Sequence, residues 1–183
     1  MKVLKTEIAD LYIIEPKVFT DERGYFFESF NQAKFSEKGL NYNFIQDNQA
    51  RSQFGVIRGL HFQKGEFAQA KLVRVLSGKI IDVALDLRKD SPTYGKCFSI
   101  ELSEENKLQL LIPRGFAHGY SVISAEAVVF YKCDNIYMPS ADGGIIFDDR
   151  ELAIDWKIAE NERIVSAKDK VNPTFEQYKL ENL

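Results

Sequence analysis

Apolar and polar residues alternate along many short stretches of this chain, and turn-forming residues separate the stretches. Residues 71–88 read as a strand, a turn at Ser77 and Gly78, and a second strand. In the second strand the odd positions from Ile81 to Leu87 are all apolar and alternate with a mixed set that includes Asp82. This is the period-two pattern of a β-strand.

Further segments of the same kind follow, with turns between them. They cover residues 96–102, 108–113, 118–123 and 126–133. Helical patterns are weak. Residues 31–39 predict about two turns that end at Gly39, and residues 103–109 predict about one turn. Many short strands with frequent turns predict an all-β fold, an antiparallel sandwich or barrel with a few short helices.

The composition is that of a soluble globular protein, and we expect a single domain over residues 1–183. The net charge of −3 argues against a nucleic-acid partner, which needs a basic surface. No apolar run reaches the ~20 residues of a membrane span, and Glu7 and Asp10 interrupt any signal-peptide core. Cys97 and Cys133 stand apart without a CxxC motif. Isolated cysteines favour a reduced, cytoplasmic protein.

Several common chemistries have no motif in this sequence. It contains no GxGxxG, GxxxxGK[ST] or GxSxG pattern, so dinucleotide-binding, P-loop and hydrolase-elbow readings have no support.

The two histidines of the chain lie in the same local setting. His61 occurs in "VIRGLHFQ" and His118 in "IPRGFAHGYSV", each after an Arg-Gly pair beside a predicted strand. Two histidines with carboxylates could hold iron or zinc, but no third ligand is near either of them. Proton transfer is the favoured role, because an imidazole with a pKa of about 6.5 exchanges a proton near neutral pH.

Two polar residues occupy strand positions that pattern as apolar. Lys71 is in phase with Val73, and Tyr131 is in phase with Val129. Taken singly, such a lysine more often reaches water along its stem, and such a tyrosine is more often core. Together with the two histidines, they predict a shared cavity with proton-transfer chemistry.

Arginine–glycine pairs give a second candidate site. Arg23 precedes Gly24, and Arg58 precedes Gly59. Glycine lets the backbone approach a ligand closely, and arginine offers two parallel donors to a phosphate. The alternative for each pair is a solvated turn.

The ordered motifs resemble one family over nearly the whole chain. They are "IIEPKVFTDERGYFFESFN", "QDN", "GVIRGLHFQ", "AQAKLVRVLSGKIIDVALDLRKDSPTYG", "LIPRGFAHGYSV", "YKCDNIYMPS" and "SAKD". This set is similar to the dTDP-4-dehydrorhamnose 3,5-epimerases, which are cupin-type jelly-roll enzymes. The resemblance implies a nucleotide-linked 4-keto-6-deoxyhexose substrate, inversion at C3 and C5, and no cofactor or metal.

The resemblance also implies roles for five residues. His61 would be the base, and Asp169 of "SAKD" would orient its ring. Lys71 would stabilise the enolate oxygen, and His118 would bind the sugar near that oxygen. Tyr131 would be the acid on the opposite face of the sugar.

Further positions match substrate-contacting residues of the family. The diphosphate and nearby sugar would contact Arg23, Arg58 and Lys168. The nucleobase would stack on Tyr137. Other substrate contacts would come from Glu28, Gln46, Asp47, Asn48 and Asp142. The chain departs from the family at Asp142, where glutamate is frequent, and at Ala50, where a polar residue is common.

Three alternatives stay open at this point. They are an enzyme of another deoxysugar pathway that inverts one carbon only, a non-catalytic sugar-binding cupin, and a metal cupin. The resemblance further implies a homodimer, with residues 3–8 and 11–16 as strands for exchange between subunits.

Overall fold

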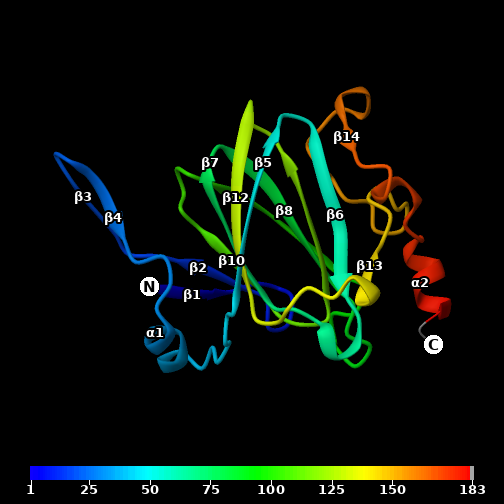
Figure 1. The fold of residues 1–183 in the computed structure, drawn as a ribbon, viewed down its shortest axis with the longest axis horizontal. Coiled ribbons are helices and arrows are strands. Elements are labelled where there is room, and N and C mark those ends of the chain that lie inside the picture. Colours follow the sequence, from blue (N-terminus) through cyan, green and yellow to red (C-terminus); the bar gives the residue numbers. More distant parts are fainter. Residues whose placement is uncertain (182–183) are drawn as a thin grey trace.

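Two β-sheets face each other and form the body of the protein in the computed structural model, which describes residues 1–181 (Figure 1). The first sheet has the order β1-β2-β10-β7-β12-β5, and the second has the order β13-β6-β11-β8-β9. Neighbouring strands in these orders are antiparallel, and β14 adds to β6 in parallel. The predicted antiparallel all-β sandwich of the cupin type is confirmed.

The elements have the following bounds. The first sheet contains β1 (Lys2–Lys5), β2 (Tyr12–Glu15), β5 (Gln46–Gln53), β7 (Lys71–Ser77), β10 (Gln109–Ile112) and β12 (Glu126–Cys133). The second contains β6 (Val56–Gln63), β8 (Lys79–Asp86), β9 (Cys97–Ser103), β11 (Phe116–Val122), β13 (Asp142–Gly144) and β14 (Ile164–Val165). A separate hairpin consists of β3 (Val18–Asp21) and β4 (Gly24–Phe27), and the α-helices are α1 (Gln32–Glu37) and α2 (Phe175–Glu181). Short 3-10 helices span Gly65–Phe67, Pro139–Ala141, Glu160–Glu162 and Asp169–Val171.

The period-two pattern of β8 arises because both of its faces are buried. Ile80 and Ala84 join the core between the two sheets. Val83 and Leu85 point the other way, into a second core that contains Trp156 of the C-terminal segment. Because β8 is apolar on both faces, its outer face also has to be covered. The C-terminal segment covers it.

The predicted helix at residues 31–39 is confirmed as α1. The Asn31 side chain accepts a hydrogen bond from the N–H of Lys34 at the start of the helix. At its end, the N–H of Gly39 bonds to Ser36 O and the N–H of Leu40 bonds to Phe35 O, a Schellman motif with glycine at positive φ. Phe35 then packs against the outer face of the first sheet.

The helical turn predicted at residues 103–109 is wrong. The segment forms a hydrogen-bonded turn between β9 and β10. Ser103 and Asn106 bond reciprocally, from each backbone N–H to the other side chain, at 3.1 and 3.0 Å. These side-chain bonds compete with helical hydrogen bonds, as expected for serine and asparagine.

The N-terminal strands pair within their own chain. β1 pairs with β2, and β2 pairs with β10 in the first sheet. The loop between them places Ile8 and Leu11 in the core between the sheets. No helix formed by residues 1–181 is long and apolar enough to cross a membrane.

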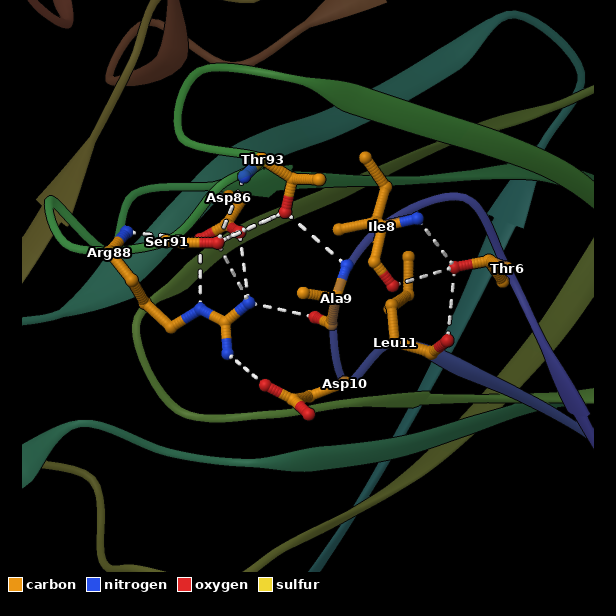
Figure 2. Close-up of polar contacts among 9 residues, drawn as sticks. All are labelled: Thr6, Ile8, Ala9, Asp10, Leu11, Asp86, Arg88, Ser91 and Thr93. Atoms are coloured by element: carbon orange, nitrogen blue, oxygen red, sulfur yellow. Dashed lines mark hydrogen bonds and ion pairs between the residues drawn. The ribbon is translucent and has the colours of Figure 1, made fainter.

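A buried polar network holds this N-terminal loop to the end of β8 (Figure 2). The guanidinium of Arg88 makes two bonds of 2.9 Å to the carboxylate of Asp86, and it reaches Asp10 and the carbonyl of Ala9 at 2.7 Å each. Burial alone would raise the pKa of Asp86, but the bonds from Arg88, Ser91 and Thr93 outweigh it, so its pKa lies below the usual value.

Asp86→Ala should destabilise the protein by about 3 kcal/mol, because it leaves the partly buried Arg88 guanidinium without its main partner. Asp86 stabilises the fold only while it is ionised. The loss in free energy of unfolding, relative to the wild type, should therefore be complete above pH ~4 and become smaller as the pH falls below that value. Chemical denaturation across this range measures the effect. Glu126→Ala, which removes an exposed ion pair with Arg51, is the control, and an equal loss of stability in both variants would contradict the prediction.

Candidate active site

A cavity of about 360 Å³ is lined by residues of both sheets and of the loops that follow them. Its lining consists of Gln46, Asn48, His61, Phe62, Gln63, Gln69, Lys71, Tyr131, Tyr137, Asp142 and Lys168. His61 belongs to β6 of the second sheet, whereas Lys71 and Tyr131 belong to β7 and β12 of the first. The predicted base and acid therefore stand on facing walls of one cavity.

The two histidines lie directly opposite each other on neighbouring strands. His118 of β11 pairs with His61 of β6, and Tyr120 pairs with Arg58. Three residues of β11 (118–120) thus oppose four residues of β6 (58–61), which is a β-bulge. A regular strand would point Arg58 and His61 to opposite faces, but the extra residue brings both to the inner side of the sheet.

Gly59 makes this bulge feasible. It has φ +127°, and a Cβ at this position would lie 2.5 Å from the Cα of Gly119 and 2.8 Å from the carbonyl oxygen of His118. β6 and β11 therefore approach more closely here than any side chain would allow. This contact explains why a glycine stands two residues before His61.

Asp169 fixes the orientation of the His61 ring. The Nε2 atom of His61 lies 2.6 Å from Oδ1 of Asp169, and Oδ2 accepts the N–H of Gly59 at 3.4 Å. Burial would raise the pKa of Asp169, but the hydrogen bond and charge of His61 outweigh it, so its pKa is lowered and it stays ionised. Because a carboxylate only accepts, Nε2 carries the proton, and Nδ1 keeps the lone pair of a base.

His118 is a second buried imidazole with its own carboxylate. Its Nε2 lies 2.8 Å from Oδ1 of Asp82, and its side chain is 6% exposed. Burial lowers the pKa of His118 more strongly than Asp82 raises it, which favours the neutral ring. His118 lies one strand away from the cavity wall and is not among the lining residues.

Burial changes Lys71 and Tyr131 in opposite directions. It lowers the pKa of Lys71, against the opposing influence of Cys133, Asp82 and Asp142. It raises the pKa of Tyr131 to about 12, which keeps the phenol protonated at neutral pH. The Lys71 ammonium lies 5.8 Å from the centre of the Tyr131 ring. An anion entering the cavity would thus meet a poorly solvated cation and a proton donor side by side.

The rim of the cavity carries a further charged cluster. Lys168 forms an ion pair with Asp142, and this bond raises the pKa of Lys168. The hydroxyl of Tyr137 lies 3.3 Å from the same carboxylate. The predicted residues Tyr137, Asp142 and Lys168 are therefore neighbours, and Gln46 and Asn48 face them from β5.

Besides His118, four predicted substrate-binding residues do not line the cavity of their own chain. Arg58 is exposed and bonds to Ser52, and Asp47 pairs with Lys132 on the outer side of β5. Arg23 lies at the tip of the β3–β4 hairpin, paired with Asp21, and Glu28 follows that hairpin, paired with Lys34. The hairpin projects away from the sheets (Figure 1).

Sequence reasoning missed Phe62, Gln63, Gln69 and Asp82. Gln63 could have been found, because it lies in phase with His61 two residues along the same strand. Asp82 carried the same signal as Lys71, a charged residue on a strand whose neighbours are apolar. Within residues 1–181, no group of three or more His, Cys, Asp and Glu side chains is arranged to hold a metal ion.

Comparison with known proteins gives consistent matches. The family model described as dTDP-4-dehydrorhamnose 3,5-epimerase matches residues 5–177. The chain is 50% identical to the Salmonella typhimurium protein of that name, over 97% of each chain. A crystal structure of the same enzyme from Elizabethkingia anophelis NUHP1 is 56% identical, with a TM-score of 0.93 over 97% of both chains.

A third relative was solved with a ligand. It is the dTDP-6-deoxy-D-glucose-3,5-epimerase of Legionella pneumophila Philadelphia 1 in complex with dTDP-4-keto-L-rhamnose. This structure is 45% identical, with a TM-score of 0.93, and the match covers 100% of the present chain and 96% of the other.

Gly59→Ala should cost more than about 3 kcal/mol, because a Cβ would collide with the backbone of β11 and separate the two histidine-bearing strands. Gly39→Ala is the matched control. Gly39 also has positive φ, but a Cβ added there would meet no atom within 4 Å, so only a backbone cost of about 1–2 kcal/mol applies. Thermal unfolding of both variants measures the difference. Equal destabilisation would show that close strand approach is unimportant at Gly59.

Proposed function

The chain belongs to the dTDP-4-dehydrorhamnose 3,5-epimerase family, and we propose that its cavity inverts C3 and C5 of a dTDP-linked 4-keto-6-deoxyglucose. The product would be dTDP-4-dehydro-L-rhamnose. The observation that carries the proposal is the placement of His61 and Tyr131 on facing walls of one cavity, with Lys71 beside the phenol.

The reaction begins with loss of a proton next to the C4 ketone. Nδ1 of His61 takes that proton, while the Asp169 carboxylate stabilises the imidazolium that forms. The electrons of the broken C–H bond move onto the ketone oxygen and give an enolate. Lys71 stabilises this oxygen, because an ammonium with little solvent around it interacts strongly with a new negative charge.

Inversion requires the new proton to arrive from the opposite face of the sugar. Tyr131 supplies it from the wall formed by the first sheet, and the enolate electrons return to form the new C–H bond. A pKa of about 12 holds the proton on Tyr131 until a strongly basic carbon takes it. After the first inversion His61 releases its proton to solvent and the Tyr131 phenolate takes one up, so the same base and acid serve C5 and C3 in turn, since both carbons flank the ketone.

The rim residues fit the nucleotide part of the substrate. Tyr137 is 52% exposed and offers its ring to the nucleobase. Lys168, at present paired with Asp142, offers its ammonium to the diphosphate, and Gln46 and Asn48 offer amides to the sugar. His118 pairs with His61 across the neighbouring strand β11, but its imidazole bonds to Asp82 and does not line the cavity, so direct contact with the sugar is not part of this proposal.

The projecting hairpin supports a homodimer in which each subunit completes the cavity of the other. Phe19, Tyr25 and Phe26 on this hairpin are 53%, 58% and 71% exposed. Phe19 and Phe26 pair on one face of the hairpin and Tyr25 lies on the other, and exposed aromatic side chains of this kind are typical of an interaction surface. Arg23 lies at the tip of the hairpin, outside its own cavity, and its proposed contact with the diphosphate therefore requires the cavity of a second copy.

Incubation in D2O with dTDP-4-keto-6-deoxyglucose should place deuterium at both C3 and C5, as measured by proton NMR. His61→Asn should slow this exchange by about 10²–10⁴-fold while dTDP still binds, because only the base is lost. Deuterium at C3 alone would identify an enzyme that inverts a single carbon. Binding without exchange in the wild type would identify a non-catalytic sugar-binding protein.

Co-expression of His61→Asn with Arg23→Ala should restore about a quarter of the wild-type activity, although each variant alone is nearly inactive. Half of the randomly paired dimers are mixed, and each mixed dimer has one intact site out of two. His61→Asn with Tyr131→Phe is the control, because both residues belong to the same cavity and no mixed dimer has an intact site. Absence of recovery in the first mixture, or a monomer in light scattering, would contradict the proposed dimer.

A further inference from the structure

Gln63 is a buried glutamine whose amide bonds to the residues on either side of Tyr137. Its Nε2 donates to the carbonyl of Ile136 at 2.9 Å, and its Oε1 accepts the N–H of Met138 at 2.6 Å. Nε2 also donates to the carbonyl of Phe67 at 2.7 Å. One donor and the acceptor of this side chain hold the segment that carries Tyr137, and the other donor holds the 3-10 helix Gly65–Phe67.

The strand that bears Gln63 also bears the proposed base. His61 and Gln63 lie two residues apart on β6 and both line the cavity. Two residues along a strand correspond to about 7 Å. The loop that carries Tyr137 is therefore tied to a fixed point about 7 Å along the strand from His61.

The Tyr137 ring has little else to hold it. It is 52% exposed, and its hydroxyl bond to Asp142 is long at 3.3 Å. Elsewhere, Gln69 bonds to the carbonyl of Asn135 at 2.8 Å, but this contact lies two residues before Tyr137. The two bonds from Gln63 tie Ile136 and Met138 to β6, whereas the bonds of the Ile136 N–H to Asn135 Oδ1 and of the Ala141 N–H to the carbonyl of Met138 stay within the same loop.

We propose that Gln63 is a positioning residue that sets the Tyr137 ring at a fixed distance from His61. A nucleobase stacked on Tyr137 then places the sugar next to the His61 ring. This inference rests on the proposed function, in which Tyr137 stacks on the nucleobase. Gln63 acts on substrate affinity through Tyr137 and takes no part in proton transfer.

The test compares Gln63→Leu, Tyr137→Ala and the double variant, with Gln49→Leu on the exposed outer side of β5 as a matched control. Calorimetry measures dTDP affinity, and steady-state kinetics separates KM from kcat. Gln63→Leu should weaken dTDP binding and raise KM about tenfold, with kcat within about twofold of wild type, since stacking on an aromatic ring contributes about that much to nucleotide affinity. The double variant should bind no more weakly than Tyr137→Ala alone, and the control should be unchanged.

Two further outcomes separate this inference from the proposed function. If Tyr137→Ala weakens dTDP binding but Gln63→Leu does not, Gln63 has no positioning role and the inference is overturned. If Tyr137→Ala does not change dTDP affinity, the proposed stacking of the nucleobase on Tyr137 is wrong, and this inference is overturned with it. Gln63→Glu keeps the acceptor for Met138 and serves if the leucine variant does not fold. It should weaken dTDP binding several-fold, and wild-type affinity in this variant would overturn the inference.

Discussion

The close approach of β6 and β11 at Gly59 and Gly119 is the contact on which the site depends. It admits an extra residue into β6, and that residue turns both Arg58 and His61 toward the inner side of the sheet. The same backbone offers the N–H of Gly59 to Asp169, which in turn holds the imidazole. One local irregularity therefore sets the direction of the His61 ring, which is the proposed base, and its contact with the Asp169 carboxylate.

The two facing sheets provide groups on opposite sides of the cavity. Abstraction and return of a proton on the same face would leave a sugar carbon unchanged, so inversion needs groups on opposite walls. His61 comes from the second sheet, and Lys71 and Tyr131 come from the first. Burial acts on the two walls in a useful way, because it lowers the pKa of Lys71 and raises that of Tyr131 to about 12. In the proposed mechanism both groups interact with the enolate anion that exists only during the reaction.

Much of the fold could be predicted from the sequence, because alternation and turn residues are local. Strands β7 and β8 and the turn at Gly78 follow from residues 71–88 alone. The bulge could not be predicted, since the spacing of Arg58 and His61 indicates opposite faces, and only pairing with β11 reveals the extra residue. The turn at residues 103–109 does not follow from the sequence pattern, because the reciprocal side-chain bonds of Ser103 and Asn106 leave no trace in the order of apolar and polar residues.

The residues of the candidate site likewise differ in whether the local sequence pattern predicts them. Lys71 and Tyr131 could be selected by local pattern, since each stands on an apolar strand face. The pairing of Asp169 with His61 spans 108 residues and came from family resemblance. The location of Arg23 outside its own cavity is a property of the tertiary structure that neither source indicated.

The most direct test of the facing base and acid is the behaviour of Tyr131→Phe in D2O with the 4-keto-6-deoxyglucose nucleotide, followed by proton NMR. Removal of the phenol alone leaves His61 free to take a proton and return a deuteron on its own side. The account predicts that deuterium enters the recovered substrate without inversion of the carbon. Inversion at the wild-type rate in this variant would contradict the account, because the second proton would then come from a group other than Tyr131.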